Sequence, residues 1–283
     1  MAVQLMSEKS IQQLYPRSEH DHALEGLYLN QRLHRRGQAG LPFVYTNFIS
    51  SLDGRIGVGV AGRDTHQVPP AIANPRDWRL FQELGAQADL LITSARYFRE
   101  YALGQAQDTL PVGAGQKFDD LRRWRLDQGL APQPDIAIIS ASLDIPAAAL
   151  AAYPNRRLHL LTGADADPGR VRALEQAGVE THYVGDGHQA EAGRAIDALA
   201  AAGYRSVYAI GGPHVLNTLL QAGRLDRLYL TFAGRILGGE DFSTFVYGSH
   251  LDPAPRLQLA QLHYDPLAPE GCGQLLGCYD LVR

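Results

Sequence analysis

A pair of glycines is the first candidate for binding chemistry. Gly211 and Gly212 follow the apolar run 206–210, and Pro213 then stands where a helix would begin. A strand that ends in glycines and opens a helix can bind a phosphate, because the backbone approaches closely and the first helical N–H groups have no helical partner. A plain tight turn would use the same glycines. The pair therefore predicts either a phosphate-binding turn or a simple connection.

A second candidate anion site follows the apolar run 88–93. Ser94 comes directly after this run, and Arg96 and Arg99 stand close behind it. A serine at a helix start with nearby arginines favours anion binding. The alternative is a serine N-cap with arginines on a solvated face.

Other predicted strands also end in small polar residues. Ser140 and Ser142 follow the run 135–139, and Thr162 follows the run 157–161. In open α/β sheets, ligands bind outside the carboxyl ends of the strands. These strand ends therefore indicate a nucleotide site.

The stretch after the predicted strand 42–49 carries the candidate acid. Asp53 and Gly54 lie between apolar stretches, which favours a hairpin turn, and Asp53 is also the carboxylate that we nominate for proton transfer. His66 follows in a glycine-rich segment typical of a flap or a loop. It is a second possible proton donor, and an exposed loop histidine is the alternative.

Composition narrows the classes of function. The chain has 283 residues, of which 45% are hydrophobic and 20% charged, as in globular proteins. A net charge of −4 argues against broad binding to nucleic acid or to anionic membranes. Cys272 and Cys278 show no zinc-type pair spacing, so we expect no metal site. The start lacks a signal-peptide pattern and no run could span a bilayer, so we expect a cytoplasmic protein.

Strands and helices alternate over most of the chain, which predicts a mostly parallel sheet with helices on both faces. One such helix begins at Asn74 and Pro75, an N-cap followed by proline. After residue 224 the stretches 225–232, 256–264 and 274–282 read as strands without helices between them, so the sheet should end antiparallel. Leucines among charges over His22–Leu33 predict an amphipathic helix. We therefore expect a helical arm over residues 1–40 and one domain over 41–283.

An ordered set of motifs resembles the pyrimidine reductase domain of riboflavin biosynthesis. The motifs cover roughly residues 42–282 and are Ser51-Leu-Asp-Gly-Arg, Asn74-Pro-Arg-Asp, Gly211-Gly-Pro, Gly223-Arg-Leu-Asp-Arg-Leu and Leu237-Gly-Gly. The resemblance implies an α/β, dihydrofolate reductase-like three-layer fold and NADPH as cofactor. It also implies a homodimer and hydride transfer to C1 of the ribosylamino group of a phosphorylated pyrimidine.

The resemblance implies a role for each candidate residue. Gly211, Gly212 and the backbone of His214 and Val215 would meet the pyrophosphate, with a cis peptide between the glycines as in dihydrofolate reductases. Ser94 and Arg96 would form the second cofactor-binding helix start, with Arg96 near the ribose 2′-phosphate, and Ser140, Ser142 and Thr162 would line the adenosine. Asn47, Ser51 and Asp53 would face nicotinamide and substrate, and Arg76 or Arg79 the substrate phosphate.

The chain departs from the family at three places. Asn47 replaces a usual lysine, Ile210 replaces a usual glutamate, and Ser94–Tyr97 replaces Gly-x-Gly-Thr. The departures leave open a divergent reductase of another imine, carbonyl or pterin-like substrate, or a nucleotide-binding protein without catalysis. An ordinary Rossmann dehydrogenase is disfavoured, because no Gly-x-Gly-x-x-Gly follows the first strand.

Overall fold

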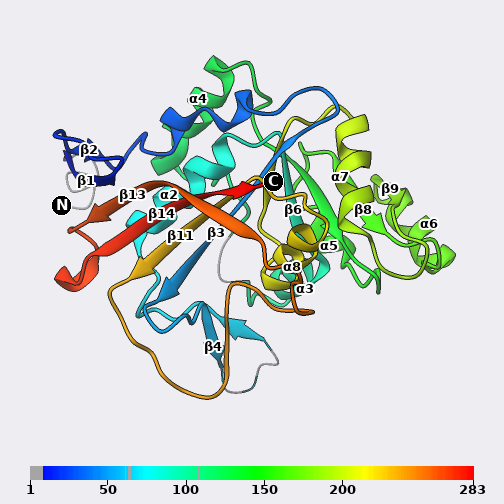
Figure 1. Cartoon of the computed structure of the whole chain (residues 1–283). Coiled ribbons are helices and arrows are strands. Elements are labelled where there is room, and N and C mark those ends of the chain that lie inside the picture. The colour runs from blue at the N-terminus through cyan, green and yellow to red at the C-terminus, as the bar shows by residue number, and fades with distance from the viewer. Residues whose placement is uncertain (1–8, 61, 63–64, 107–108) are drawn as a thin grey trace.

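A computed structural model describes residues 9–60, 62, 65–106 and 109–283, and in this part of the chain the strands form one large mixed sheet and one small sheet. The large sheet runs across the molecule from β1 and β2 at one end to β8 and β9 at the other (Figure 1). Seven of its strands are parallel neighbours: β3 (Phe43–Ser51), β6 (Leu90–Ser94), β7 (Asp135–Ile139), β8 (Leu158–Thr162), β9 (Val179–Tyr183), β10 (Ser206–Ala209) and β11 (Arg227–Ala233).

The other end of the large sheet is antiparallel. It contains β14 (Gln274–Val282), β13 (Arg256–Asp265), β1 (Lys9–Tyr15) and β2 (His22–Ala23). The strand order is β2-β1-β13-β14-β11-β3-β10-β6-β7-β8-β9. The predicted α/β fold, with a mostly parallel sheet and antiparallel C-terminal strands, is therefore confirmed.

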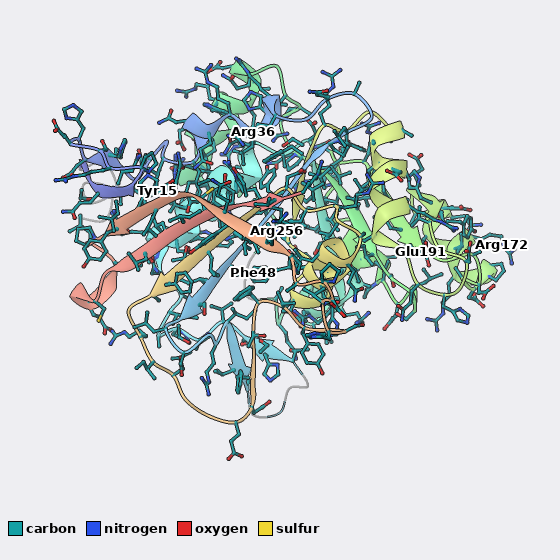
Figure 2. All side chains as sticks on the ribbon, viewed as in Figure 1. Tyr15, Arg36, Phe48, Arg172, Glu191 and Arg256 are labelled. Carbon is teal, nitrogen blue, oxygen red and sulfur yellow. The ribbon has the colours of Figure 1, made fainter. Side chains whose placement is uncertain are left out.

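Helices cover both faces of the parallel strands, and buried apolar side chains fill the space between the layers (Figure 2). One face carries α2 (Pro75–Ala86), α3 (Ala95–Ala102), α5 (Ala147–Leu150) and α6 (Pro168–Gln176), with α4 (Asp119–Asp127) packed beside α2. The opposite face carries α7 (Ala192–Ala201) and α8 (Pro213–Gln221). Short 3-10 helices are η1 (Leu29–Gln31), η2 (Leu33–Arg35), η3 (Gln116–Phe118) and η4 (Pro269–Gly271).

A small sheet projects beyond the end of β3 (Figure 1). It consists of β12 (Phe242–Ser243), β4 (Gly57–Gly59) and β5 (His66–Gln67). The Asp53–Gly54 pair forms the expected turn, in which the Gly54 N–H donates to the Ser51 carbonyl at 3.0 Å. The predicted hairpin is wrong, because β3 and β4 belong to different sheets.

The amphipathic helix predicted over His22–Leu33 is also wrong. Its leucines are buried as expected, but the segment contains β2, η1 and the start of η2. The carboxylate of Glu83 accepts the N–H groups of Gly26, Tyr28 and Leu29 at 2.6, 3.0 and 3.4 Å, so these donors are satisfied without a helix. β2 pairs with β1, and β1 pairs with β13, so the N-terminal residues extend the main sheet. The division of the chain into an arm and a domain at residue 40 stays a prediction.

Candidate functional site

The carboxyl ends of five adjacent parallel strands bring together polar residues that are far apart in the sequence. The strands lie in the order β3, β10, β6, β7 and β8. Because they are parallel, their last residues share one edge of the sheet. This edge carries, in order, Asp53, Gly211, Ser94, Ser140 and Thr162.

The turn between β10 and α8 requires two glycines for different reasons. Gly212 precedes the first helical residue, and its φ of 87° and ψ of −172° strain any residue with a side chain. A Cβ on Gly211 would lie 2.6 Å from Cγ2 of Val215. The turn thus exposes the N-terminal backbone of α8, at His214 and Val215, at the edge of the sheet. The expected cis peptide is wrong, since the Gly211–Gly212 bond is not among the cis bonds of the described residues.

Arg96 connects the two helix starts at this edge. Its side chain is 51% exposed and lies 3.5 Å from the Glu100 carboxylate. Its Nη2 atom lies 4.0 Å from where a Cβ on Gly212 would be. Ser94 is the N-cap of α3, but its side chain makes no capping hydrogen bond. A guanidinium beside two helix N-termini is an arrangement that suits an anion.

The three candidate adenosine contacts differ in how they are bonded. The Ser140 hydroxyl accepts the Leu143 N–H at 2.9 Å and closes its own turn. The Ser142 carbonyl accepts an Arg170 N–H at 2.6 Å. Thr162 is fully buried, and among the described residues its Oγ1 has no hydrogen-bond partner. Burying a hydroxyl without a hydrogen-bond partner costs about 1–3 kcal/mol of folding free energy. Thr162 therefore places an unpaired polar group near this edge.

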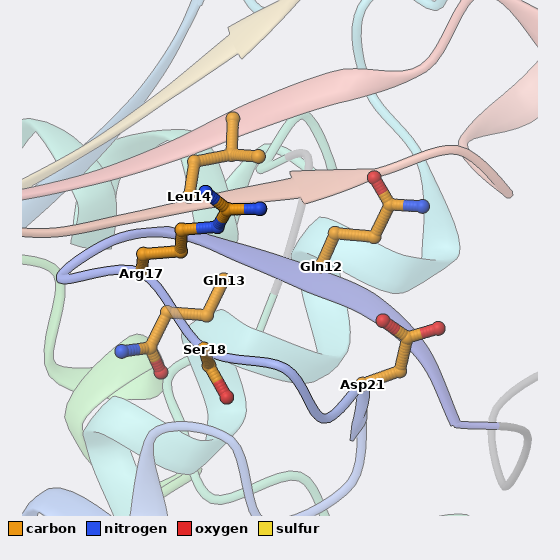
Figure 3. Close-up of a pocket in the computed structure, with 6 residues that line it drawn as sticks. All are labelled: Gln12, Gln13, Leu14, Arg17, Ser18 and Asp21. Carbon is orange, nitrogen blue, oxygen red and sulfur yellow. The ribbon is translucent and has the colours of Figure 1, made fainter.

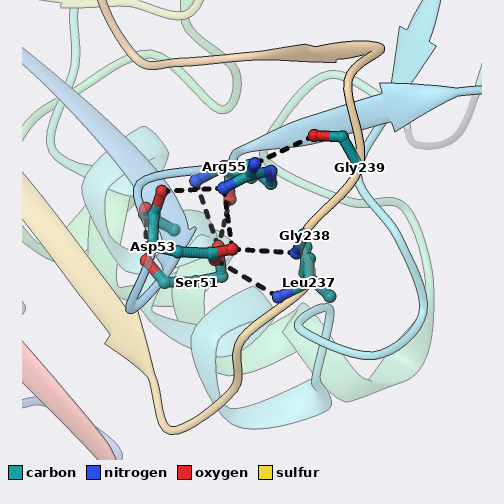
Figure 4. Close-up of polar contacts among 7 residues, drawn as sticks. Ser51, Asp53, Arg55, Leu237, Gly238 and Gly239 are labelled. Carbon is teal, nitrogen blue, oxygen red and sulfur yellow. Dashed lines mark hydrogen bonds and ion pairs between the residues drawn. The ribbon is translucent and has the colours of Figure 1, made fainter.

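Asp53 joins two segments that are far apart in the sequence (Figure 4). Its carboxylate accepts the Ser51 hydroxyl at 2.5 Å and an Arg55 N–H at 2.7 Å. It also accepts the backbone N–H groups of Leu237 and Gly238 at 3.2 and 2.8 Å. The Ser51 hydroxyl first, and then the backbone donors, hold the pKa of Asp53 well below its usual range. An ionised carboxylate has no proton to give, so these contacts argue against Asp53 as a proton donor.

The two arginines expected at the substrate phosphate are already paired. The Arg76 Nε lies 2.7 Å from the Asp265 carboxylate, and the two side chains are 6% and 0% exposed. Arg79 is 4% exposed and contacts Glu83 at 3.1 Å and Asp120 at 2.5 Å. Separating a buried ion pair leaves an uncompensated charge. These contacts anchor α2, and they argue against either guanidinium as the phosphate ligand.

The sequence matches one known protein family over most of its length. The family model of the RibD C-terminal domain matches residues 42–266. The chain belongs to this family. A comparison with curated proteins gave no match.

Solved structures share the fold of this chain. A pyrimidine reductase-like protein from Corynebacterium diphtheriae is 22% identical, with a TM-score of 0.64 over 86% of this chain and 92% of that one. The Saccharomyces cerevisiae riboflavin biosynthesis reductase is 13% identical, with a TM-score of 0.53 over 91% of this chain and 99% of that one. A Thermotoga maritima deaminase/5-amino-6-(5-phosphoribosylamino)uracil reductase is 15% identical, with a TM-score of 0.54. The match covers 90% of this chain and 60% of the Thermotoga protein.

Asp77 is a candidate that sequence reasoning missed. It lies in the first turn of α2, and its carboxylate accepts the Thr231 hydroxyl at 2.7 Å. Burial raises the pKa of Asp77 to about 6. Thr231 is the β11 partner of Ile49, one same-face step along β3 from Asn47. The Asn74-Pro-Arg-Asp motif was the available signal, but local spacing gives no indication of a raised pKa.

Asn47 stands where RibD reductases usually carry lysine, and a hydrogen bond from Tyr208 holds its side chain. Its side-chain oxygen accepts the hydroxyl of Tyr208, which stacks on Tyr45 with ring centroids 5.0 Å apart. Asp77 is close enough to Tyr208 to raise the pKa of its phenol, although burial contributes most. The face of the sheet under α2 therefore carries a polar group of Asn47, Tyr208, Asp77 and Thr231.

His66 lies in the small sheet and not at the strand ends. Its Nε2 is 2.7 Å from the Asp241 carboxylate, and its side chain is 34% exposed. The contact ties β5 to the segment before β12. The partner of His66 is therefore Asp241, beside the small sheet, and no described contact joins His66 to Asn47 or Asp77.

Two surface hollows lie away from the strand ends. One, of about 270 Å³, is lined by residues 12–14, Arg17, Ser18 and Asp21 at the N-terminal end of the sheet (Figure 3). The other, of about 150 Å³, is apolar and lies beside α8. Neither gathers the residues described above, so the strand ends remain the candidate site. No helix in the described part of the chain is long and apolar enough to cross a membrane.

Proposed function

We propose that this protein is an NADPH-dependent reductase of a ribosylaminopyrimidine phosphate, with hydride transfer to C1 of the ribosylamino group. Membership of the RibD C-terminal domain family supports the reaction class. The proposal of NADPH as cofactor rests on the glycine turn before α8, with Arg96 beside it. A homodimer in the cytoplasm, which the family implies, is part of the proposal.

The residues at the strand ends fit such a cofactor. Gly212 has no side chain, so the turn lies directly beside the Arg96 guanidinium, and a pyrophosphate would meet this guanidinium and the backbone of His214 and Val215. Arg96 would pair with the 2′-phosphate, and exposed Ser142 would lie on the adenosine side. When bound, NADPH supplies the hydride, so the protein needs only to position the acceptor carbon and exclude water.

Asp77 is the proton donor in this proposal. Protonating the nitrogen of the open-chain imine makes its carbon a better hydride acceptor. A carboxyl group with a pKa of about 6 holds a proton over part of the physiological range, unlike that of Asp53. Asn47 and Tyr208 would then position the substrate. The hydrogen bond from the Gly238 N–H to Asp53 would hold the loop around Gly238 against the site.

The direct test is a fluorescence titration with NADPH and NADH, followed by addition of the ribosylaminopyrimidine phosphate to the tighter complex. Tight NADPH binding and oxidation on substrate addition are expected. Binding without oxidation would favour the divergent reductase suggested by Asn47 and Ile210, and a panel of imine, carbonyl and pterin-like acceptors would then be tried. Binding without turnover of any acceptor would favour a non-catalytic protein. Failure to bind either nucleotide would overturn the proposal.

Arg96→Ala tests the cofactor preference separately. The variant should lose at least ~10-fold in NADPH affinity, because a charge-assisted contact to phosphate contributes about 1.5–3 kcal/mol. NADH affinity should change much less. Arg99→Ala, on the same helix, is the matched control. Equal losses for both nucleotides would place the 2′-phosphate elsewhere.

A further inference from the structure

A cluster of histidines and a carboxylate lies on the far strands of the sheet, away from the glycine turn. His159 is on β8, and Glu180 and His182 are on β9. Strand pairing sets His159 opposite Glu180, and His182 is two residues further along β9. The side chains therefore project from one face of two paired strands. β7 and β6 separate β8 from β10, so the cluster lies away from the glycine turn, and His159 stands three residues before the strand end at Thr162.

The three side chains converge on one point. His159 Nδ1 lies 3.0 Å from His182 Nε2. The two Glu180 oxygens lie 3.5 Å from His159 Nδ1 and 3.6 Å from His182 Nε2. The edge of a tetrahedron of zinc ligands is about 3.3 Å, given Zn–N and Zn–O distances of about 2.0 Å. The ligand atoms are therefore spaced much as they would be around such an ion.

Neighbouring groups fix which nitrogen of His159 carries the proton. The Tyr204 hydroxyl lies 2.7 Å from the Asp135 carboxylate and 2.7 Å from His159 Nε2. An ionised carboxylate has no proton, so the phenol donates to Asp135 and His159 Nε2–H donates to the phenol oxygen. In the neutral imidazole this leaves a lone pair on Nδ1, the atom that faces Glu180 and His182.

The cluster has one donor for two acceptors. The His182 Nε2 atom lies 3.0 Å from the His159 Nδ1 lone pair and 3.6 Å from the Glu180 carboxylate, so its single N–H is shared between them. A metal ion would bind all three groups at once. The histidine–tyrosine–aspartate chain behind His159 is the kind of support that orients metal ligands. The guanidinium of Arg157 pairs with Asp135 at 2.8 Å.

We propose that His159, Glu180 and His182 form a zinc site, with water as the fourth ligand. Two imidazoles and a carboxylate are a ligand set that zinc uses. His159 is 1% exposed and His182 16%, whereas Glu180 is 62% exposed, so the ion would enter from the Glu180 side. The ion would tie edge strand β9 to β8 and need take no part in hydride transfer. Cysteine spacing could not reveal this site, because its ligands are brought together by strand pairing.

The test uses the full chain, stripped of metal and titrated with Zn²⁺ by calorimetry. One ion per chain with a Kd below about 1 μM is expected, and Co²⁺ in its place should give visible absorption bands of a low-coordinate site. Saturating Zn²⁺ should also raise the Tm, because it binds the folded state. An absence of stoichiometric binding, or no change in Tm, would overturn the proposal.

Variants separate this site from adventitious binding. His182→Gln and Glu180→Gln should each weaken Zn²⁺ at least ~10-fold, and Tyr204→Phe should weaken it about 10-fold through the loss of outer support. His188→Gln, at an exposed histidine in the loop after β9, is the matched control and should bind as the parent does. If His182→Gln bound Zn²⁺ as tightly as the parent, the ion would belong elsewhere. NADPH affinity should be unchanged in His182→Gln.

Discussion

Gly212→Val is expected to lower NADPH affinity at least ~100-fold, about 2.7 kcal/mol, while the protein stays folded. The variant places a β-branched side chain between the glycine turn and Arg96, whose Nη2 atom lies 4.0 Å from the Cβ position of residue 212. It also forces a residue with a Cβ into a φ of 87° and a ψ of −172°, which costs about 1–3 kcal/mol of backbone strain. The start of α8 would shift, and with it the N–H groups proposed to meet the pyrophosphate.

A fluorescence titration measures the loss, and circular dichroism with a melting curve measures folding. Gly223→Val is the matched control, because Gly223 also has a positive φ, of 61°, with open space around it, but lies just after the far end of α8. It should lose stability without losing cofactor affinity. Should Gly212→Val prove too unstable, Gly212→Ala makes the same comparison with a smaller side chain. Normal NADPH binding by a folded Gly212 variant would show that the glycines form only a turn.

Asp77→Asn is expected to lower kcat about 100-fold at neutral pH, the range found for loss of a positioned proton donor. The parent should lose activity as the pH rises above about 6, because the Asp77 carboxyl then loses its proton. The amide cannot donate in this way, so the descending limb near pH 6 should disappear from the pH profile. Asp53 cannot produce that limb, since its pKa lies well below the usual range.

Stability gives a second measurement on the same residue. The pKa of Asp77 is higher in the folded protein than the usual value, so folding is favoured by protonation and stability falls as the pH rises towards 6. Asp77→Asn removes this loss. The variant should therefore be more stable than the parent at pH 8, with a smaller difference at pH 4.

Asp127→Asn, at an exposed position at the end of α4, is the control for both measurements. It should change neither the pH profile nor the pH dependence of stability. If Asp77→Asn kept the limb near pH 6, another group would supply the proton, and Asp77 would be a positioning residue for Thr231.

The sequence by itself determined the features that depend on neighbouring residues. The N-cap at Asn74, the proline that opens α8 and the glycine turn before it were predicted where the structure has them. Apolar runs predicted the parallel strands and the antiparallel strands after residue 224, but not β1, β2 or the small sheet. In these cases the hydrophobic period and the local backbone requirement act over a few residues.

Tertiary structure alone decided which polar groups meet. Glu83 is 54 residues or more from the backbone N–H groups that it binds, and Asp265 is 189 residues from Arg76. The first contact replaces a predicted helix, and the second occupies a predicted phosphate ligand. The raised pKa of Asp77 and the convergence of His159 with Glu180 and His182 likewise depend on burial and strand pairing. Residue types and spacing specify none of these contacts, because charge pairing and desolvation are set by distances that exist only after the chain has folded.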